Sequence, residues 1–136
     1  RRIVQRVLML NQTATSISAG VDVSDFRNCI LSIAGSGSAN LKVFVKGAIR
    51  RTDVTTTAPS FNIRASARDY RNNWDYLEVV DLEDGTAIDG DDGINLSGNV
   101  IRNFEVNLNA FDWLCVESTA IIVGTVSVVG SFVTNE

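Results

Sequence analysis

Alternation of apolar and polar residues with a period of two is the feature that most constrains how this chain can fold. Asn28–Ala34, Leu41–Gly47 and Asn103–Asn109 each alternate in this way, and a helical period of 3.6 is almost absent. Because successive side chains of a strand point to opposite faces, the pattern predicts half-buried β-strands. The residues that we expect to face the core share one side of such segments and are Cys29, Leu31, Ile33, Leu41, Val43, Val45, Phe104, Val106, Leu108, Val126 and Val128.

Turn residues separate these segments at short intervals. Gly35–Ser38, Asp84-Gly85 and Ser97–Asn99 are typical of tight turns and hairpin loops. Eight or nine short strands with this spacing predict an all-β, antiparallel β-sandwich of jelly-roll type. Phe61–Asn72 lacks the alternation and is predicted to be a loop or a short helical turn. A chain of 136 residues without a linker is predicted to be a single domain, residues 1–136.

Three segments are apolar on both faces. Tyr76–Val80 and Trp113–Val116 are of this kind, and Arg2–Leu10 is similar apart from Arg2 and Arg6. Such segments are typical of central strands that are covered on both sides. No apolar run reaches the roughly 18–20 residues that a membrane span needs, so no membrane association is expected.

The residue types needed for common catalytic sites are scarce. The chain has no histidine, which excludes Ser–His and Cys–His nucleophilic pairs. Cys29 and Cys115 each lie in an apolar segment, and no secretion signal is recognisable, so both are predicted to be free thiols in the core. We therefore expect no enzyme activity and no cofactor.

An acidic stretch, Asp81–Gly93, places six carboxylates in thirteen residues. Calcium prefers oxygen ligands from such loops, and Asp89, Asp91 and Asp92 are the candidate ligands. The spacing is not that of an EF-hand, because Ile94 stands where the turn glycine belongs. The alternative is a solvated acidic hairpin, which we favour over any bound metal.

Charge is divided unevenly along the chain. Residues 1–71 carry 11 Lys and Arg against 4 acids, and residues 72–136 carry one Arg against 12 acids. Because the net charge is −4 and no nucleic-acid motif is present, acidic protein surfaces are the expected partners rather than nucleic acid. The candidate contact residues of the basic half are Arg1, Arg2, Arg6, Arg50, Arg51, Arg64 and Arg68.

Two interpretations of the basic segments follow from this division. Arg50–Arg71 of one copy is predicted to meet Asp81–Asp92 of the next in a trimer or ring, with charge setting the register. Arg1, Arg2 and Arg6 belong either to an arm that anchors to a neighbour or to an ordinary first strand with solvated arginines.

Aromatic residues gather near Asn72-Asn73. Tyr70, Trp74 and Tyr76 lie there, and Phe44 stands between two lysines. Aromatic faces beside amides are what a carbohydrate-binding module or adhesin-like domain would use. The other interpretation, which we favour, is packing in the core or at a subunit interface, with Trp74 and Phe44 as interface candidates.

The order and spacing of the predicted strands and turns resemble those of small bacteriophage virion proteins with a β-sandwich fold. The resemblance is carried by Val21–Phe26 with the strand and Gly/Ser turn after it, by Asn73–Leu82 running into Asp84-Gly85 and Ile88–Ile94, and by Phe104–Asn109 with Trp113-Leu114 and Gly124–Val128. It covers most of residues 15–133 and contains no catalytic signature.

Proteins of this kind are capsid decoration (cement) proteins, head fibres or tail accessory proteins. The resemblance implies a non-enzymatic structural protein that is assembled in the host cytoplasm and resides in the virion in many copies. The implied partners are further copies of the chain and the major capsid or tail protein, with capsid decoration favoured.

Overall fold

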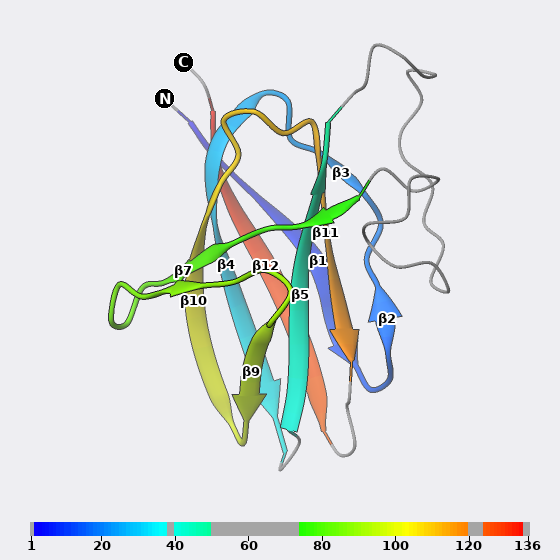
Figure 1. Cartoon of the computed structure of the whole chain (residues 1–136). Coiled ribbons are helices and arrows are strands. Elements are labelled where there is room, and N and C mark those ends of the chain that lie inside the picture. Colours follow the sequence, from blue (N-terminus) through cyan, green and yellow to red (C-terminus); the bar gives the residue numbers. More distant parts are fainter. Residues whose placement is uncertain (1, 38–39, 50–73, 120–123, 135–136) are drawn as a thin grey trace.

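The computed structural model describes residues 2–37, 40–49, 74–119 and 124–134. These residues form twelve β-strands and no helix (Figure 1). None of them belongs to a helix that is long and apolar enough to cross a membrane. The predicted loop or helical turn at Phe61–Asn72 lies outside the described residues.

The strands form two antiparallel sheets. Sheet A has the order β1-β12-β4-β10-β7-β8. Its strands are β1 (Ile3–Gln12), β12 (Thr125–Thr134), β4 (Phe26–Ser36), β10 (Val100–Asn107), β7 (Val79–Asp81) and β8 (Ala87–Ile88). Sheet B has the order β2-β11-β5-β6, with β3 also paired to β11 and β9 to β5. Its strands are β2 (Ser16–Ile17), β11 (Trp113–Thr119), β5 (Asn40–Ala48), β6 (Asp75–Tyr76), β3 (Val21–Asp22) and β9 (Ile94–Ser97).

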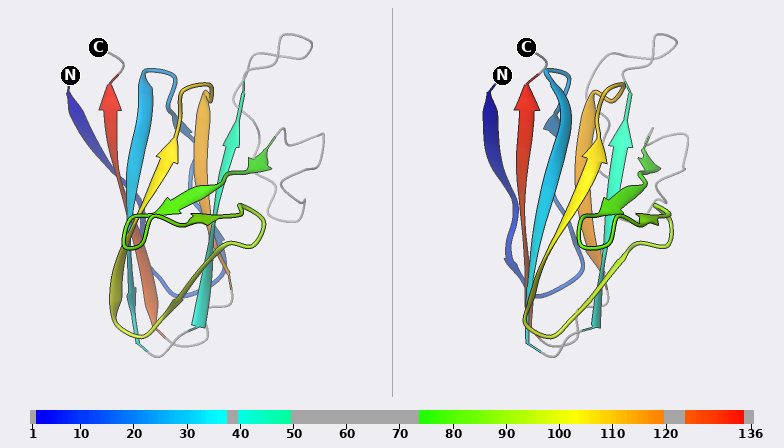
Figure 2. Two further views of the ribbon diagram at one scale, coloured as in Figure 1. Left: turned by 60° about the vertical axis from the view of Figure 1, so that its left-hand side comes forward. Right: turned by 90° about the vertical axis from the view of Figure 1, so that its left-hand side faces the viewer.

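The topology is that of a jelly roll. The framework of sheet A is β1, β12, β4 and β10. The framework of sheet B opposite it is β11, β5 and β9, and β2 and β3 together occupy the position next to β11. Successive framework strands alternate between the two sheets, except that β5 and β9 both belong to sheet B. Figure 2 shows the two layers, with β1, β12 and β4 in one and β11 and β5 in the other. This arrangement of two Greek keys confirms the predicted fold class.

The core fills the space between the sheets. All eleven residues predicted to face inward are buried, and none of them is more than 3% exposed. Phe132 on β12 is fully buried, and its ring centroid lies 5.1 Å from that of Phe26. Cys29 and Cys115 are both free and buried, as predicted.

The structure has more strands than the eight or nine predicted. The additional ones are short: β2, β3, β6 and β8 have two residues each, and β7 has three. Runs this short contain too few residues to show an alternation, so the sequence pattern could not reveal them. Tyr76–Val80, expected as one strand, is divided between β6 of sheet B and β7 of sheet A.

The expectation for Arg2–Leu10 was wrong. Within the described part of the chain, β1 pairs with β12 alone and lies at the edge of sheet A. Ile3, Val7 and Leu10 are 54%, 64% and 66% exposed. Apolar composition shows that a strand is suited to a central, covered position. Whether the strand lies there depends on which strands pair, and this pairing places β1 at the edge of sheet A.

Candidate functional site

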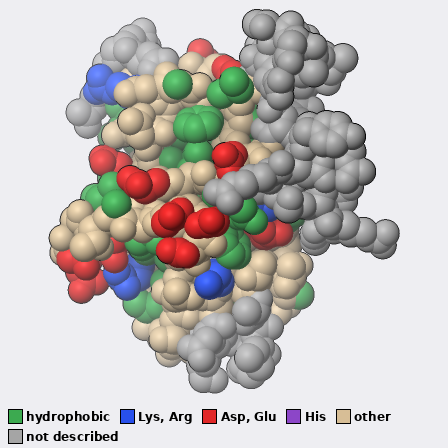
Figure 3. Space-filling view, viewed as in Figure 1, with side chains coloured by type: hydrophobic (Ala, Val, Ile, Leu, Met, Phe, Trp, Pro, Cys, Tyr) green, Lys and Arg blue, Asp and Glu red, His purple; other side chains and the backbone are tan. Residues whose placement is uncertain are grey.

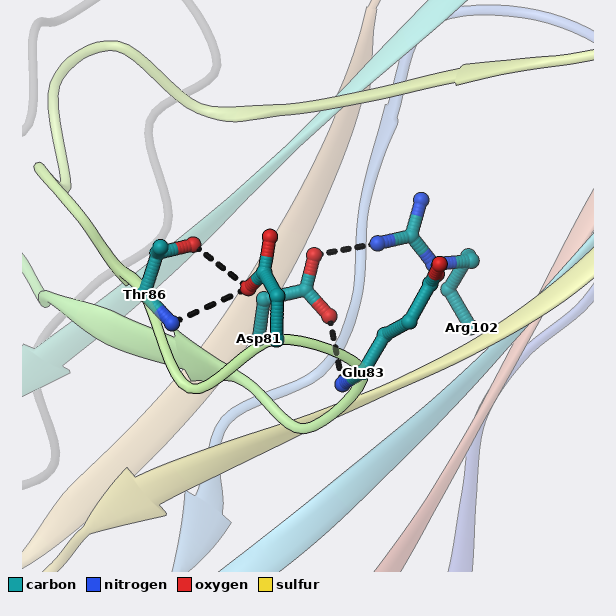
Figure 4. Close-up of polar contacts among 5 residues, drawn as sticks. Asp81, Glu83, Thr86 and Arg102 are labelled. Atoms are coloured by element: carbon teal, nitrogen blue, oxygen red, sulfur yellow. Dashed lines mark hydrogen bonds and ion pairs between the residues drawn. The ribbon is translucent and has the colours of Figure 1, made fainter.

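A hydrogen-bonded turn organises the acidic region between β7 and β8. The Asp81 side chain is buried, and its carboxylate accepts hydrogen bonds from the Glu83 N–H at 2.9 Å and from the Arg102 guanidinium (Figure 4). Arg102 Nε also lies 3.3 Å from a carboxylate oxygen of Glu83. The single arginine of the acidic half therefore ties this turn to β10.

The next acid of the turn caps it locally. Asp84 Oδ1 accepts hydrogen bonds from the Thr86 hydroxyl at 2.7 Å and from the Thr86 N–H at 3.0 Å. These two hydrogen bonds favour the charged carboxylate and hold the pKa of Asp84 below its ordinary value. The acids at 81–84 are thus occupied in building the turn.

Asp89, Asp91 and Asp92 form a separate, exposed group. Their carboxylate oxygens lie within 4.8 Å of one another. Figure 3 shows acidic side chains gathered across the middle of the surface that faces the viewer. Gly90 packs so closely that an added Cβ would lie 2.7 Å from the Leu77 carbonyl oxygen. The spacing is compatible with calcium and with a solvated turn. A calcium titration distinguishes them, because only a bound ion would raise the unfolding temperature of the protein and fail to do so in Asp91→Asn.

Trp74 lies in a small second core on the outer face of sheet B. It is 5% exposed and packs with Ala48 and Cys115, and the half-buried residues Ile17, Tyr76 and Trp113 surround this cluster. The outer face of sheet B is therefore covered at this point, and we call it the covered face. Packing, not a free aromatic platform, is the use that the structure shows for Trp74.

A buried ion pair adjoins this cluster. Lys46 Nζ lies 2.9 Å from a carboxylate oxygen of Glu117, and the two side chains are 6% and 14% exposed. The ammonium also lies 5.5 Å from the Tyr76 ring centroid. Burial raises the pKa of the neighbouring Cys115 thiol to about 12, so this thiol stays protonated and unreactive.

Phe44 extends the covered face toward the acidic group. Its ring centroid lies 5.4 Å from that of Tyr76, and the Lys42 ammonium lies 5.9 Å from the Phe44 ring. Gly93 lies beneath these side chains, because an added Cβ there would meet Lys42 and Phe44 within 3.0 Å. Phe44 and the Asp89–Asp92 loop are thus brought together, which the sequence did not predict.

The outer face of sheet A is open over its described strands, and we call it the open face. Three rows of paired residues run across β1, β12 and β4 on this face. The first row is Ile3, Val133 and Asn28, the second is Gln5, Ser131 and Ile30, and the third is Val7, Val129 and Ser32. Ile30 and Ile101 are 40% and 69% exposed. These nine row positions carry no charged side chain, whereas Glu105 of β10 is exposed and stands beside Ile30, so the uncharged part of the face is limited to β1, β12 and β4. Exposed aliphatic side chains gathered on one face are typical of interaction sites on soluble proteins.

The predicted arginine sites are only partly placed. Arg6 is exposed on the edge strand β1, Arg2 is exposed directly before it, and Thr134 donates its N–H to the Arg2 carbonyl at 2.9 Å. This is the arrangement of an ordinary first strand. Arg1, Arg50, Arg51, Arg64 and Arg68 lie outside the described residues, so their predicted contact with Asp81–Asp92 of a neighbour stays a prediction.

A polar surface hollow of about 200 Å³ lies at one end of sheet A. Its lining consists of Arg27, Asn28, Glu105, Asn107 and Asn109. Asn28 donates a weak hydrogen bond to Glu105 at 3.4 Å. The sequence analysis did not find this hollow, because its residues come from two strands that are distant along the chain.

Comparison with known proteins rests on the fold. No protein-family model matches the chain, and a search of the curated proteins finds no match. Among solved structures, the crystal structure of SPBc2 prophage-derived protein YomS is similar, with a TM-score of 0.67 and 15% sequence identity. The match covers 98% of this chain and 94% of that chain. At this identity the likeness shows a shared β-sandwich fold over nearly the whole length.

Proposed function

We propose that the protein is a non-enzymatic structural component of a phage particle, present in many copies. Its partners are further copies of itself and the major capsid or tail protein, and capsid decoration is the favoured role. The open face of sheet A is the observation that carries the proposal. A sheet face with exposed aliphatic side chains, and with no charge in its rows across β1, β12 and β4, is suited to contact with other proteins.

The physical properties of the described residues fit this role. The core is continuous between the sheets, and its largest side chains are fully buried. Both thiols are buried, and burial raises the pKa of each to about 12, so they are protected from oxidation and exchange. A domain built in this way presents interfaces and resists proteolysis without any ligand chemistry.

The fold likeness adds support from a different direction. The similar crystal structure is that of a prophage-derived protein, and the match extends over nearly all of both chains. The order and spacing of strands and turns in the sequence resemble those of virion β-sandwich proteins. These two observations together favour a phage particle over other settings for a binding domain.

Mass spectrometry of purified particles tests the proposal. Particles of the phage that encodes the chain should contain it in a fixed stoichiometric ratio to the major capsid or tail protein. Immunogold labelling of the same particles would then place it on the capsid or the tail. Absence of the chain from washed, infectious particles would contradict the proposal.

Carbohydrate binding is the second candidate function, and the polar hollow at Asn107 and Asn109 is the observation that favours it. Its amides and carboxylate supply donors and acceptors of the kind that sugar hydroxyls need. Trp74 does not contribute, because it is buried. A glycan array followed by calorimetry, with Asn107→Ala as the site variant and Asn103→Ala as the control, would detect saturable binding at the hollow.

A further inference from the structure

The long edge of sheet A differs from the other sheet ends in the described structure. β1 has ten residues, whereas the other described strands that pair on one side only have four (β9) or two (β8, β2, β3 and β6). Very short edge strands are a usual protection against unwanted pairing, because an exposed edge offers unpaired N–H and C=O groups to any strand. We propose that β1 pairs with β1 of a second copy, antiparallel, about a twofold axis at Gln5.

Among the described residues, the register with β12 shows which main-chain groups of β1 point away from a partner strand. Thr134 donates its N–H to the Arg2 carbonyl, and Ile3 stands opposite Val133. Pairs that exchange hydrogen bonds alternate with pairs that do not in an antiparallel ladder. Val4 and Arg6 therefore point their N–H and C=O groups toward β12, whereas Ile3, Gln5 and Val7 point theirs away from it.

The side chains of β1 favour the axis at Gln5. There, Ile3 of one copy stands opposite Val7 of the second, and these side chains are 54% and 64% exposed in the single chain. An axis at Arg6 would place two arginines opposite each other, and an axis at Val4 would place Arg2 opposite Arg6. Like charges directly opposite one another destabilise a sheet, whereas aliphatic pairs stabilise it.

The pairing also joins the two open faces. Ile3 and Val7 lie in the same rows as Val133 and Val129, so the contact continues the uncharged surface of sheet A into the second copy. β1 lies at the outer edge of its layer in Figure 2. A bulge follows Val7, which limits the regular pairing to Ile3–Val7 and to about six main-chain hydrogen bonds. A contact of this size lies at the small end of specific protein interfaces, so we expect a weak dimer.

The pairing follows from the edge geometry and holds whether or not the chain is mounted on a particle. Failure of the dimer in purified protein and absence of the chain from particles are therefore separate results. It also differs from the charge contact predicted for Arg50–Arg71, which involves another part of the chain.

Charge substitutions at the edge test the register. We expect sedimentation velocity over a concentration series to show a monomer–dimer equilibrium for the unaltered chain. The combined Ile3→Lys and Val7→Lys variant should weaken dimerisation about tenfold or more, because lysines then oppose each other. The combined Ile3→Glu and Val7→Lys variant should restore it, more fully at low salt, because opposite charges then meet. Ile101→Lys, on an isoleucine that is also exposed but lies away from β1, is the matched control and should dimerise normally.

A cysteine placed on the axis gives an independent readout. Gln5→Cys should form a disulfide-linked dimer under mild oxidation, because Cα atoms of a hydrogen-bonded pair lie about 5.5 Å apart. Arg6→Cys should not, since its two copies would be separated by more than about 7 Å. Cys29 and Cys115 are buried and do not interfere.

Three results with the purified protein would overturn the inference: a monomer at all concentrations up to about 1 mM; a dimer that the paired lysines do not weaken; or no cross-link at Gln5 in a protein that does dimerise. Protection of the β1 amides from hydrogen exchange only within particles would also overturn it, because another virion protein would then occupy the edge.

Discussion

The two outer faces of the sandwich are built from similar strands and end in different environments. On sheet B, Ala48 and Cys115 are 2% and 1% exposed, because Trp74 and Tyr76 pack over them. On sheet A, Ile30 and Ile101 are 40% and 69% exposed in the described structure. One face therefore carries cover from its own chain, and the other is exposed as far as the described residues show.

The comparison shows how a sheet face acquires a role. Alternation gives every strand an inner and an outer side, but the fate of the outer side depends on whether a later segment crosses it. The segment with β6 pairs with β5 at the end of sheet B, and its Trp74 and Tyr76 pack on the outer face beside the ion pair of Lys46 and Glu117. The following predictions are ordered from the largest expected change to the smallest.

Removal of the cover from sheet B should have the largest effect. Trp74→Ala should lower the free energy of unfolding by about 4 kcal/mol, because a buried ring is lost and a cavity is left. Urea unfolding measures this. Cys115 should also become reactive toward Ellman's reagent in the folded variant while Cys29 stays protected. Equal reactivity of both thiols would indicate global loosening and would contradict the assignment of Trp74 to the covered face.

The buried ion pair should be nearly as sensitive. Lys46→Met leaves the Glu117 carboxylate buried without its partner and should cost about 3 kcal/mol. Replacing both residues by Met should recover most of that loss, because neither charge then needs compensation. A double-mutant cycle from denaturant unfolding gives the coupling. Additive losses from the two single substitutions would refute a mutual interaction.

Alkaline pH should destabilise the fold through both thiols. Burial raises the pKa of Cys29 and Cys115 from 9.0 to about 12 in the folded protein. Their contribution to stability is therefore complete below pH 9 and is lost as the pH rises toward 12. At pH 10 each thiol should cost about 1.4 kcal/mol relative to pH 8, because only the unfolded chain ionises. Cys29→Ala and Cys115→Ala should each remove about half of the difference.

Substitutions on the open face should have the smallest effect on stability. Ile30→Thr and Ile101→Thr should each change the free energy of unfolding by less than about 0.5 kcal/mol, since these side chains already contact solvent. Thermal and urea unfolding of dilute protein, with Leu31→Ala as the buried neighbour for comparison, measure the contrast. A loss above about 2 kcal/mol would mean that another part of the chain covers sheet A.

The acidic turn shows where sequence patterns lose precision. The sequence predicts a hairpin with abundant carboxylates at Asp81–Gly93, and in the structure the first part of this stretch is the turn between β7 and β8, whereas Asp89, Asp91 and Asp92 follow β8. The pairing of Asp81 with Arg102 was not predicted, because the two residues are 21 positions apart and meet only where β10 lies beside β7. Such long-range pairs depend on strand order, which alternation does not encode.

By itself, the sequence determined the all-β class, the buried side of the long alternating strands and the state of the cysteines. Each of these follows from local periodicity or from the apolarity of neighbouring residues. The tertiary structure alone decided that β1 is an edge strand, that Trp74 is covered and that sheet A has an open face. These features depend on which strands pair and which segments cross which sheet, and chain segments far apart in sequence settle them through packing and hydrogen bonding.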